Sequence, residues 1–456
     1  MSPIVHGLVA VCLAAVMPAV TSATEEITPK APVHAYVHPW NTVPLQPTVY
    51  GVNNEWRQVT HAEFPAFADK MRALNYQMLR FPGGWEAEHY DWATNRTPGW
   101  EHSPTVPGAN STQAKNAAAN LAFVMRTAPY IDNPTTANLD ALANQARDLV
   151  LAHGDKVKHW LVGNEWWLHW GGGSERAVKL RRYATVARAI TNRMKAANPA
   201  IKVYVTGDWT QPDEFGSIKA VFDANSSWPN VDGIDLHVYS GDNPALPTHY
   251  SNIAPNLADI KATTGKSDLF ISEWAATKGD STDNKRALRS VNNMVLVMHK
   301  LIRAGATAMT YWPAPDIAPG IGLVDEADGV YTDLPHGQAF RWMATSMAQH
   351  SVQTTGTPET AASHNTVART ITVLVPAKTL SNQAITVHFA NTALTGVLSA
   401  QAMWMPDPDT TKEPARITDV TTTLDTANNT VTVVANPGAT GRGSSYELIR
   451  LIVRYQ

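Results

Sequence analysis

Short apolar segments rich in β-branched residues alternate with longer segments whose apolar residues recur at helical spacing. The short segments are typical of buried parallel strands, because they are apolar throughout and end near Gly, Pro or Asn. We predict strands over 48–52, 77–81, 121–126, 157–162, 202–206, 231–239, 268–274 and 307–312. We predict helices over 64–74, 138–152, 174–197, 215–225, 253–263, 284–304 and 338–349. Eight strands alternating with helices over 48–350 predict a (β/α)8 TIM barrel, which is an α/β fold.

The pattern changes near residue 351, where apolar and polar residues begin to alternate with a period of two. We predict antiparallel strands over 366–375, 384–389, 430–434 and 446–453. Residues 351–456 are therefore expected to form a β-sandwich domain. A strand over 33–37, in the N-terminal segment 24–47, is expected to pair with it. The region lacks an aromatic cluster, which favours a structural role over a sugar-binding one.

The N-terminus carries an apolar run over 8–20 that is short for a membrane span and is followed by small residues suited to cleavage. This pattern predicts a signal peptide over 1–23 and a protein that is secreted or periplasmic. Cys12, the sole cysteine, lies in this segment. The mature chain is therefore expected to contain no disulfide and no thiolate metal site.

Charge and tryptophan content restrict the classes of partner. The chain has 36 basic and 39 acidic side chains, a formal net charge of -3, which argues against nucleic acid or an anionic membrane. Beyond the leader, no segment is apolar for long enough to span a membrane. Of 15 tryptophans, only Trp404 lies beyond residue 350. Several of the others fall at predicted strand ends, where indole rings can line a ligand site.

Two predicted strands carry the same local arrangement, a glutamate followed directly by a tryptophan. Glu165 and Trp166 come shortly after the strand over 157–162. Glu273 and Trp274 are the last two residues of the strand over 268–274. Indole rings offer flat apolar faces to a sugar ring, and by excluding water they raise the pKa of a neighbouring carboxyl. Two facing carboxylates are the minimum for cleaving a glycosidic bond. Taken alone, Glu165 fits equally well as a solvated loop acid beside core tryptophans.

Together, several stretches resemble clan A glycoside hydrolases and look most like family 51, which contains α-L-arabinofuranosidases and some endoglucanases. The matching motifs are Leu79-Arg80-Phe81-Pro82-Gly83-Gly84, Tyr90-Asp91-Trp92, Val162-Gly163-Asn164-Glu165, Gly171-Gly172-Gly173, Arg182-Tyr183-Ala184, Asp232-Gly233-Ile234-Asp235-Leu236-His237-Val238-Tyr239 and Ser272-Glu273-Trp274. The similarity extends over residues 48–345 and, like the pattern of segments, implies a barrel.

The resemblance also implies roles for individual residues. Glu165 corresponds to the general acid/base and Glu273 to the nucleophile of a retaining mechanism. Asn164 is implied to bind the sugar 2-hydroxyl, and His237 and Tyr239 to support Glu273 and the neighbouring subsite. From its sequence position alone, His237 fits equally well as a structural histidine.

Two further residues gain a role in the same way. Glu55 falls where the family's first strand offers a sugar-binding glutamate. Arg80 is implied to lie beneath the site, near Glu273, and to keep that carboxyl ionised.

Two tryptophans depart from the family pattern. Trp85 stands where the arabinofuranosidases carry Asn or Cys, and Trp312 ends the eighth strand where they show a polar residue. Both replace polar contacts with a stacking surface, which favours a pyranose or a chain-binding cleft over arabinofuranose. Trp166, together with Trp167 and Trp170, is expected to line the cleft.

The sequence therefore predicts a secreted retaining glycoside hydrolase acting on a polysaccharide or oligosaccharide, with an endo-β-glycanase as the first candidate. The alternatives are an exo-acting α-L-arabinofuranosidase and, in another class, a non-catalytic carbohydrate-binding barrel. No cofactor or metal is expected, since the loop acids Glu86, Glu88 and Asp91 with His89 are spaced too irregularly for a metal site. The oligomeric state is left open.

Overall fold

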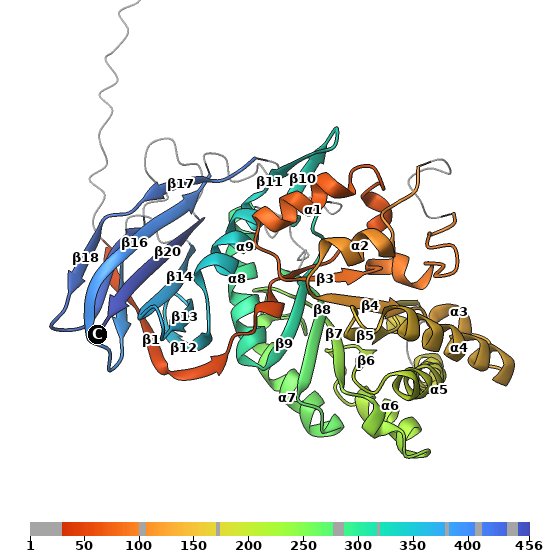
Figure 1. Cartoon of the computed structure of the whole chain (residues 1–456). Helices are drawn as coiled ribbons and strands as arrows, with labels where there is room; N and C mark the ends of the chain where they lie inside the picture. Colours follow the sequence, from red (N-terminus) through yellow and green to blue (C-terminus); the bar gives the residue numbers. More distant parts are fainter. Residues whose placement is uncertain are drawn as a thin grey trace, which may run out of the picture.

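The structure is a computed structural model that describes residues 30–99, 106–169, 174–276, 287–316, 320–378, 383–405, 413–435 and 446–456. The predicted signal peptide over 1–23, Trp170 and the Gly171-Gly172-Gly173 motif lie outside the described residues. Figure 1 shows two bodies of secondary structure, a barrel surrounded by helices and a β-domain beside it.

Eight strands close into a barrel, as the apolar segments predict. They are β2 (Gly51–Val52), β3 (Met78–Phe81), β4 (Leu121–Met125), β5 (His159–Val162), β6 (Lys202–Gly207), β7 (Gly233–Ser240), β8 (Asp268–Ala276) and β9 (Ala306–Tyr311). Val52 of β2 pairs in parallel with both Leu79 of β3 and Tyr311 of β9, and this double pairing closes the cylinder. Because the strands run parallel, their C-terminal ends open onto one face.

The first barrel strand is shorter than predicted. Pro47–Val49 forms a 3-10 helix, η1, in place of the start of a strand. The reason is that Pro47 has a fixed φ and no N–H to give to a ladder. Gly51 then lets β2 lie close to its neighbour, since a Cβ at this position would come within 2.4 Å of the Met309 carbonyl oxygen.

Helices surround the barrel on its outside (Figure 1). They are α1 (Phe64–Ala73), α2 (Ser111–Ala117), α3 (Ala128–Ile131), α4 (Thr136–His153), α5 (Ser174–Ala197), α6 (Glu214–Asp223), α7 (Ile253–Thr264), α8 (Ala287–Arg303) and α9 (Pro335–Ser346). All the predicted helices are present, with ends displaced by a few residues. The short helices α2 and α3 were not predicted, although Asn110 and Gln113 form a capping box that signals the start of α2.

Ten strands form a second sheet in the order β17-β16-β20-β14-β13-β12-β1-β15-β19-β18. They are β1 (Lys30–Pro44), β12 (His350–Gly356), β13 (Ala361–Asn365), β14 (Thr370–Lys378), β15 (Gln383–Phe389), β16 (Leu394–Trp404), β17 (Arg416–Asp419), β18 (Thr422–Asp425), β19 (Thr430–Ala435) and β20 (Tyr446–Tyr455). Val387 of β15 and Leu451 of β20, from opposite halves of this order, belong to one apolar core. The sheet therefore folds over that core as the predicted β-sandwich.

Several strands were not predicted. The edge strands β17 and β18 contain no buried residue, so they lack the apolar alternation that marks a half-buried strand. A separate hairpin of β10 (Val324–Ala327) and β11 (Val330–Asp333) lies between β9 and α9. Gly329, with φ of 77°, forms its turn, and this residue was the available sequence signal.

The N-terminal strand β1 lies inside the β-domain, between β12 and β15 (Figure 1). Val37 lies opposite Thr354 in the antiparallel pairing and opposite Phe389 in the parallel one. The prediction that residues 33–37 pair with the C-terminal domain is therefore confirmed. The first described residues and the last residues of the chain share one sheet.

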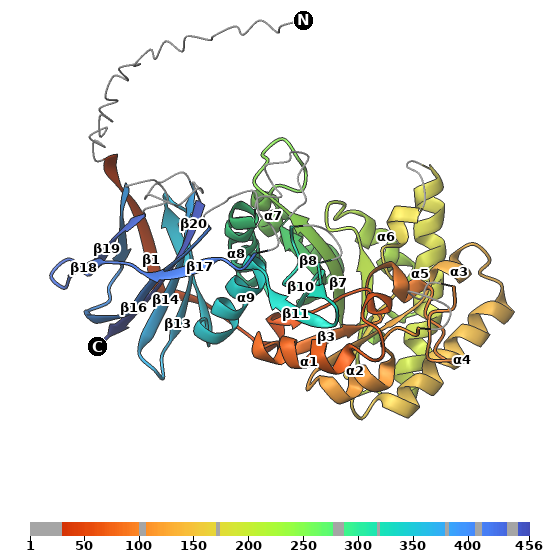
Figure 2. The ribbon, with the colours of Figure 1, turned by 90° about the horizontal axis from the view of Figure 1, so that it is seen from above.

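Helix α8 lies between the barrel and the β-domain (Figure 2). His299 Nε2 is 3.0 Å from the Val352 carbonyl oxygen of β12. Lys378 Nζ of β14 donates to Asn293 Oδ1 at 2.6 Å and to Asp242 Oδ2 at 3.0 Å. Two residues of α8 and one of the loop after β7 thus bind strands of the β-domain, and such polar contacts fix it against the barrel.

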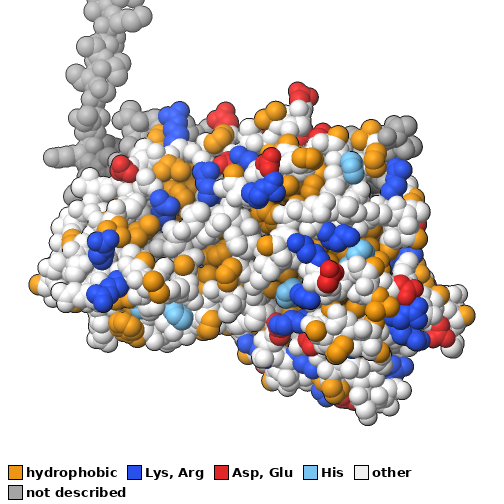
Figure 3. All heavy atoms as spheres, in the orientation of Figure 1, with side chains coloured by type: hydrophobic (Ala, Val, Ile, Leu, Met, Phe, Trp, Pro, Cys, Tyr) orange, Lys and Arg blue, Asp and Glu red, His pale blue; other side chains and the backbone are white. Residues whose placement is uncertain are grey.

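The described surface carries both signs of charge. On the face shown in Figure 3, Lys and Arg side chains lie among Asp and Glu side chains, in keeping with the small net charge of -3. None of the described helices combines the length and the apolar character that crossing a membrane requires.

Replacing Val37 by Asp tests whether β1 is an integral part of the β-domain. Val37 is 0 % exposed, so the variant buries an unpaired carboxylate. We expect the free energy of unfolding to fall by more than about 4 kcal/mol, measured by thermal unfolding followed by circular dichroism. The matched control is Tyr36→Asp on the opposite, 39 % exposed face of the strand, for which we expect a loss below about 1 kcal/mol. Equal unfolding midpoints for Val37→Asp and the unmodified protein would contradict the assigned place of β1.

Candidate active site

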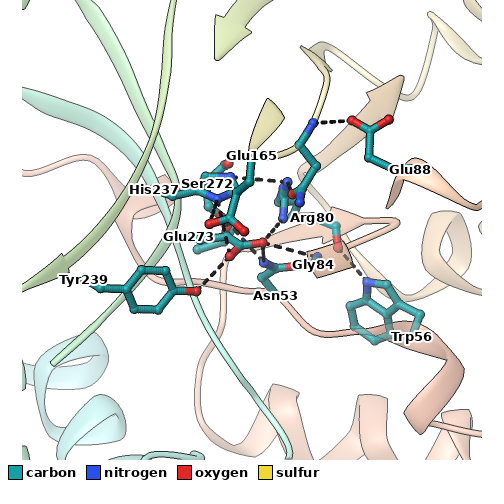
Figure 4. A network of polar contacts seen from close by, with 12 residues as sticks. Asn53, Trp56, Arg80, Gly84, Glu88, Glu165, His237, Tyr239, Ser272 and Glu273 are labelled. Atoms are coloured by element: carbon teal, nitrogen blue, oxygen red, sulfur yellow. Dashed lines mark hydrogen bonds and ion pairs between the residues drawn. The ribbon is translucent and has the colours of Figure 1, made fainter. Parts of the chain in front are cut away.

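Glu165 and Glu273 lie beside each other at the C-terminal mouth of the barrel (Figure 4). Glu273 belongs to β8, and Glu165 follows β5 after a short turn. A carboxylate oxygen from each glutamate and a ring nitrogen of His237 all lie within 4.8 Å of one another. Strands β5, β7 and β8 bring the three side chains together because the parallel barrel directs the C-terminal ends of all its strands to the same face.

The Glu273 carboxylate is 2 % exposed and is held by donors from three other parts of the barrel. Its Oε1 accepts from Arg80 Nη1 at 2.5 Å, from Asn53 Nδ2 at 3.2 Å and from the main-chain N–H of Gly84 at 3.2 Å. Its Oε2 accepts from the Tyr239 hydroxyl at 2.8 Å. Both oxygens are therefore fixed in position, with hydrogen bonds that favour the charged form.

Nearby positive charge keeps Glu273 ionised. Burial alone would raise its pKa, but His237, Arg80 and the Tyr239 hydroxyl outweigh burial and lower the pKa below its ordinary value. Burial alone would lower the pKa of His237, but the carboxylates of Glu273 and Glu165 outweigh it and raise that pKa. His237 Nδ1 lies 2.9 Å from Glu165 Oε1 and 3.4 Å from Glu273 Oε2. The imidazole thus connects the two carboxylates.

Arg80 lies beneath the two glutamates and does not reach the cleft. Its side chain is 0 % exposed, and besides Glu273 it binds Asn164, whose Oδ1 accepts from Nη2 at 2.7 Å. The predicted location near Glu273 is correct. Its guanidinium is buried under the groups that it positions, so Arg80 acts on the site through Glu273 and Asn164 and not by lining the cleft.

Glu165 sits in a turn with an unusual backbone. Gly163 has φ of 89° and Glu165 has φ of 43°, which is uncommon for a residue with a side chain. A Cβ at position 163 would come within 2.6 Å of Thr127 Oγ1, so glycine is required there for space as well. Between these two residues, the main-chain N–H of Asn164 donates to a carboxylate oxygen of Glu88 at 2.6 Å (Figure 4).

The side chain of Asn164 is buried, and its Nδ2 has no hydrogen-bond partner among the described residues. A buried amide N–H without a partner costs free energy unless a ligand supplies an acceptor. The role implied for it, donation to a sugar 2-hydroxyl, stays a prediction, and this free donor is in keeping with it.

A cavity of about 660 Å³ opens over the two glutamates. Five aromatic side chains line it, namely Trp85, Trp167, Trp209, Tyr239 and Trp312. Glu55, also predicted, lines it as well and is held by Arg57, whose Nη2 is 2.9 Å from its Oε2. The ring of Trp312 meets that of Tyr239 edge-on, with centroids 5.9 Å apart. The cavity thus combines acidic groups with flat apolar walls.

The prediction that Trp166 lines the cleft is wrong. Its side chain is 1 % exposed, its Nε1 donates to the Thr206 carbonyl oxygen at 3.2 Å, and its ring stacks on Tyr183. Trp167, predicted to line the cleft as well, does line the cavity. Both belong to the 3-10 helix η4 (Trp166–His169), where adjacent side chains point in directions about 120° apart, so one enters the core and the other the cleft.

Three further residues belong to the site although the sequence gave them no role in it. Asn53 donates to Glu273, Trp209 lines the cavity, and Glu88 binds the turn that carries Glu165. Asn53 and Trp209 come just after predicted strands, so their position at strand ends was a usable signal. Glu88 had no such signal, because its partners are main-chain groups.

Metal binding has one geometric candidate among the described residues. Glu165, His237 and Glu273 are the group whose ligand atoms come close enough together. The guanidinium of Arg80 lies 2.5 Å from Glu273, and its positive charge opposes a cation at the same carboxylate. The loop acids Glu86 and Glu88 are instead engaged by main-chain and hydroxyl donors.

No protein-family model matches the chain, and neither does any curated protein. Solved structures match over nearly its whole length. A family 51 α-L-arabinofuranosidase from Thermotoga petrophila RKU-1 is 14% identical, with a TM-score of 0.68 over 92% of this chain and 100% of its own. One from Xanthomonas axonopodis pv. citri is 12% identical, with a TM-score of 0.69 over 93% and 100%.

A monomeric β-xylosidase from Caulobacter crescentus CB15 is also similar, at 11% identity and a TM-score of 0.57 over 92% of this chain and 99% of its own. At such identities the likeness concerns the fold. The chain therefore has the barrel-and-sandwich fold of family 51 glycoside hydrolases, and the resemblance inferred from its motifs is confirmed at that level.

Proposed function

We propose that the protein is a retaining O-glycoside hydrolase that acts by double displacement. The observation that carries this proposal is the separation of Glu165 and Glu273, which place a carboxylate oxygen each within 4.8 Å of one another. Retaining enzymes hold their two carboxyls about 5–5.5 Å apart, whereas inverting enzymes need roughly 6.5–9.5 Å for an intervening water. The fold shared with known glycosidases supports the same reaction class.

In the first step, Glu273 attacks the anomeric carbon and Glu165 gives its proton to the leaving oxygen, so the glycosidic bond breaks as the ester to Glu273 forms. In the second step, Glu165 takes a proton from water, which displaces Glu273 and restores both groups. The donors on both oxygens of Glu273, including Arg80 and Tyr239, hold its charge in one place before attack. Positioning of this kind lowers the activation barrier.

A non-catalytic carbohydrate-binding barrel is less well supported. Such a protein has no need of a buried ionised carboxylate, whose desolvation must be offset by Arg80 and His237. A strongly compensated buried acid next to a second acid is typical of catalytic sites.

For the substrate, we propose a pyranose-based polysaccharide or oligosaccharide, which the protein would cleave as an endo-β-glycanase. Trp85 and Trp312 line the cavity where polar contacts would suit a smaller furanose ring. Trp167, whose ring lies edge-on to His237 at 5.8 Å, adds an aromatic wall beside Glu165. The second candidate is an exo-acting α-L-arabinofuranosidase, favoured by the similarity of the fold to solved structures of such enzymes. Export to the periplasm or beyond, as the leader predicts, would bring the enzyme to such polymers.

Replacing Glu273 by Ala tests the mechanism. We expect turnover of an aryl glycoside to fall more than about 10⁴-fold, and azide to restore part of it as a glycosyl azide of inverted configuration. Glu165→Ala should cost about 10²–10⁴-fold, with azide giving the retained anomer. Nuclear magnetic resonance of the products distinguishes the two. The control is Glu326→Ala at an exposed position. Unchanged turnover in Glu273→Ala would rule the mechanism out.

Replacing His237 by Gln tests the electrostatic role of the imidazole. Glu273 must be ionised to attack, so activity is lost as pH falls through its pKa, which lies below the ordinary value of 4.5. Without the imidazolium this pKa rises, and we expect the acid limb of kcat/KM to move to higher pH by about 1 unit or more. The exposed His61→Gln serves as a control. An acid limb that stays in place, or moves to lower pH, would contradict this role.

A panel of aryl glycosides and polysaccharides tests the substrate. We expect β-glucan or xylan, and aryl β-pyranosides, to be cleaved faster than aryl α-L-arabinofuranosides. Trp312→Ala should lower kcat/KM for the preferred pyranoside by about 10-fold through loss of the stacking surface. Trp40→Ala, in the β-domain, is the control. Faster cleavage of the arabinofuranoside by the unmodified enzyme would favour the second candidate.

A further inference from the structure

We propose that Glu88 is a positioning residue for Glu165, because its carboxylate holds the turn that aims the acid/base at the leaving oxygen. This inference rests on the proposed function and adds a part that neither the family motifs nor the cleft contains. Glu88 ends the 3-10 helix η3 (Gly84–Glu88), which follows β3, and its side chain is 1 % exposed.

The carboxylate of Glu88 collects main-chain donors from two neighbouring strand ends. It accepts from the N–H of Asn164 at 2.6 Å, directly after β5. It also accepts from the N–H groups of Thr127 at 2.5 Å and Ala128 at 2.7 Å, directly after β4, and its Oε1 lies 3.2 Å from Thr127 Oγ1. One side chain therefore joins the loops after β3, β4 and β5.

These main-chain N–H groups are the hydrogen-bond donors that compensate the buried carboxylate of Glu88 for the loss of water. Among the residues that the structure describes, no cation pairs with Glu88. Burial raises the pKa of Glu88 above its ordinary value, and the N–H donors of Ala128, Thr127 and Asn164 oppose that rise. Without the carboxylate, three main-chain N–H groups would be buried without acceptors, which is a conformation that the loops would leave.

The turn that Glu88 holds has a strained backbone conformation, which other residues must stabilise. Gly163 and Glu165 both have positive φ, and the N–H of Asn164 lies between them. Positive φ at a non-glycine residue such as Glu165 is strained and persists only where the surroundings impose it. Tyr183 and Thr127 pack against Gly163, and Glu88 supplies the polar contact to the N–H at the centre of the turn.

The chain offers a matched control two residues away. Glu86 lies in the same 3-10 helix, is also 1 % exposed and also accepts from a main-chain N–H, that of Arg57 at 2.8 Å. Its other oxygen accepts from Thr97 Oγ1 at 2.5 Å. It therefore holds the loop after β2, and none of its contacts with other described residues reaches the turn of Glu165. Glu86→Gln and Glu88→Gln change the same chemistry at equal burial.

The experiment compares these two variants on aryl glycosides whose leaving groups differ in basicity. Because kcat/KM reports the first bond cleavage, we expect Glu88→Gln to lower it about 10²-fold for a phenyl glycoside, whose leaving oxygen needs a proton. For a dinitrophenyl glycoside, whose dinitrophenolate leaves without being protonated, we expect less than about a 3-fold change in kcat/KM. Azide, which needs no general base, should raise kcat of Glu88→Gln on the dinitrophenyl glycoside. Glu86→Gln should lower kcat/KM by a similar factor for both substrates and show no azide effect.

A loss in Glu88→Gln that is the same for both leaving groups would overturn the positioning role, as would an unchanged kcat/KM. If Glu88→Gln does not fold, as judged by circular dichroism, Glu88→Asp keeps the anion with a shorter reach and must show the same leaving-group dependence at a smaller magnitude. Glu165→Ala distinguishes this failure from that of the proposed function. If the activity of Glu165→Ala does not depend on the leaving group, the acid/base assignment itself is wrong. If Glu165→Ala shows this dependence and the Glu88 variants do not, only the positioning role of Glu88 is wrong.

Discussion

An ionised carboxylate inside the protein is the constraint on which the site depends. Glu273 is almost fully buried, and removing its charge from water costs several kcal/mol unless other groups replace the lost hydration. Arg80 of β3 and His237 and Tyr239 of β7 are those groups. No neighbouring pair of strands contains all of them, so the nucleophile is ionised and oriented only once the barrel has closed.

The same principle governs the loops above the barrel. Glu86 and Glu88 are buried acids, yet their partners are main-chain N–H groups and hydroxyls rather than basic side chains. A carboxylate with two oxygens can satisfy several main-chain donors at once, which a loop without regular secondary structure needs when it is buried. The 3-10 helix after β3 therefore organises the mouth of the barrel on both sides, toward Glu55 and toward Glu165.

The β-domain contributes to the barrel through α8 rather than through the cleft. Lys378 reaches from β14 to Asn293 on α8 and to Asp242 in the loop after β7. The N-terminal strand β1 completes the sheet of that domain, so the chain leaves the β-domain, forms the barrel and returns. No described residue of the β-domain lines the cavity above the glutamates, which supports a structural role for the domain.

The sequence by itself determined the barrel, the sandwich and the two glutamates. Segments of strand length that are apolar throughout indicate strands buried on both faces, as in a parallel barrel. The repeated Glu-Trp arrangement marked the ends of two of these strands. It also indicated Arg80, which the structure places under Glu273. Edge strands such as β17 and the hairpin β10–β11 escaped prediction because exposed strands carry no apolar period.

Tertiary structure alone decided which side of a short helix faces the cleft and which acids hold main-chain groups. Trp166 and Trp167 are identical in type and adjacent, and only the packing of Tyr183 against one of them sends it into the core. Glu88 is indistinguishable in sequence from a solvated loop acid, because its partners are N–H groups that every residue except proline has. Side-chain patterns record burial along an element, whereas the direction of a side chain in a loop depends on neighbours distant in the chain.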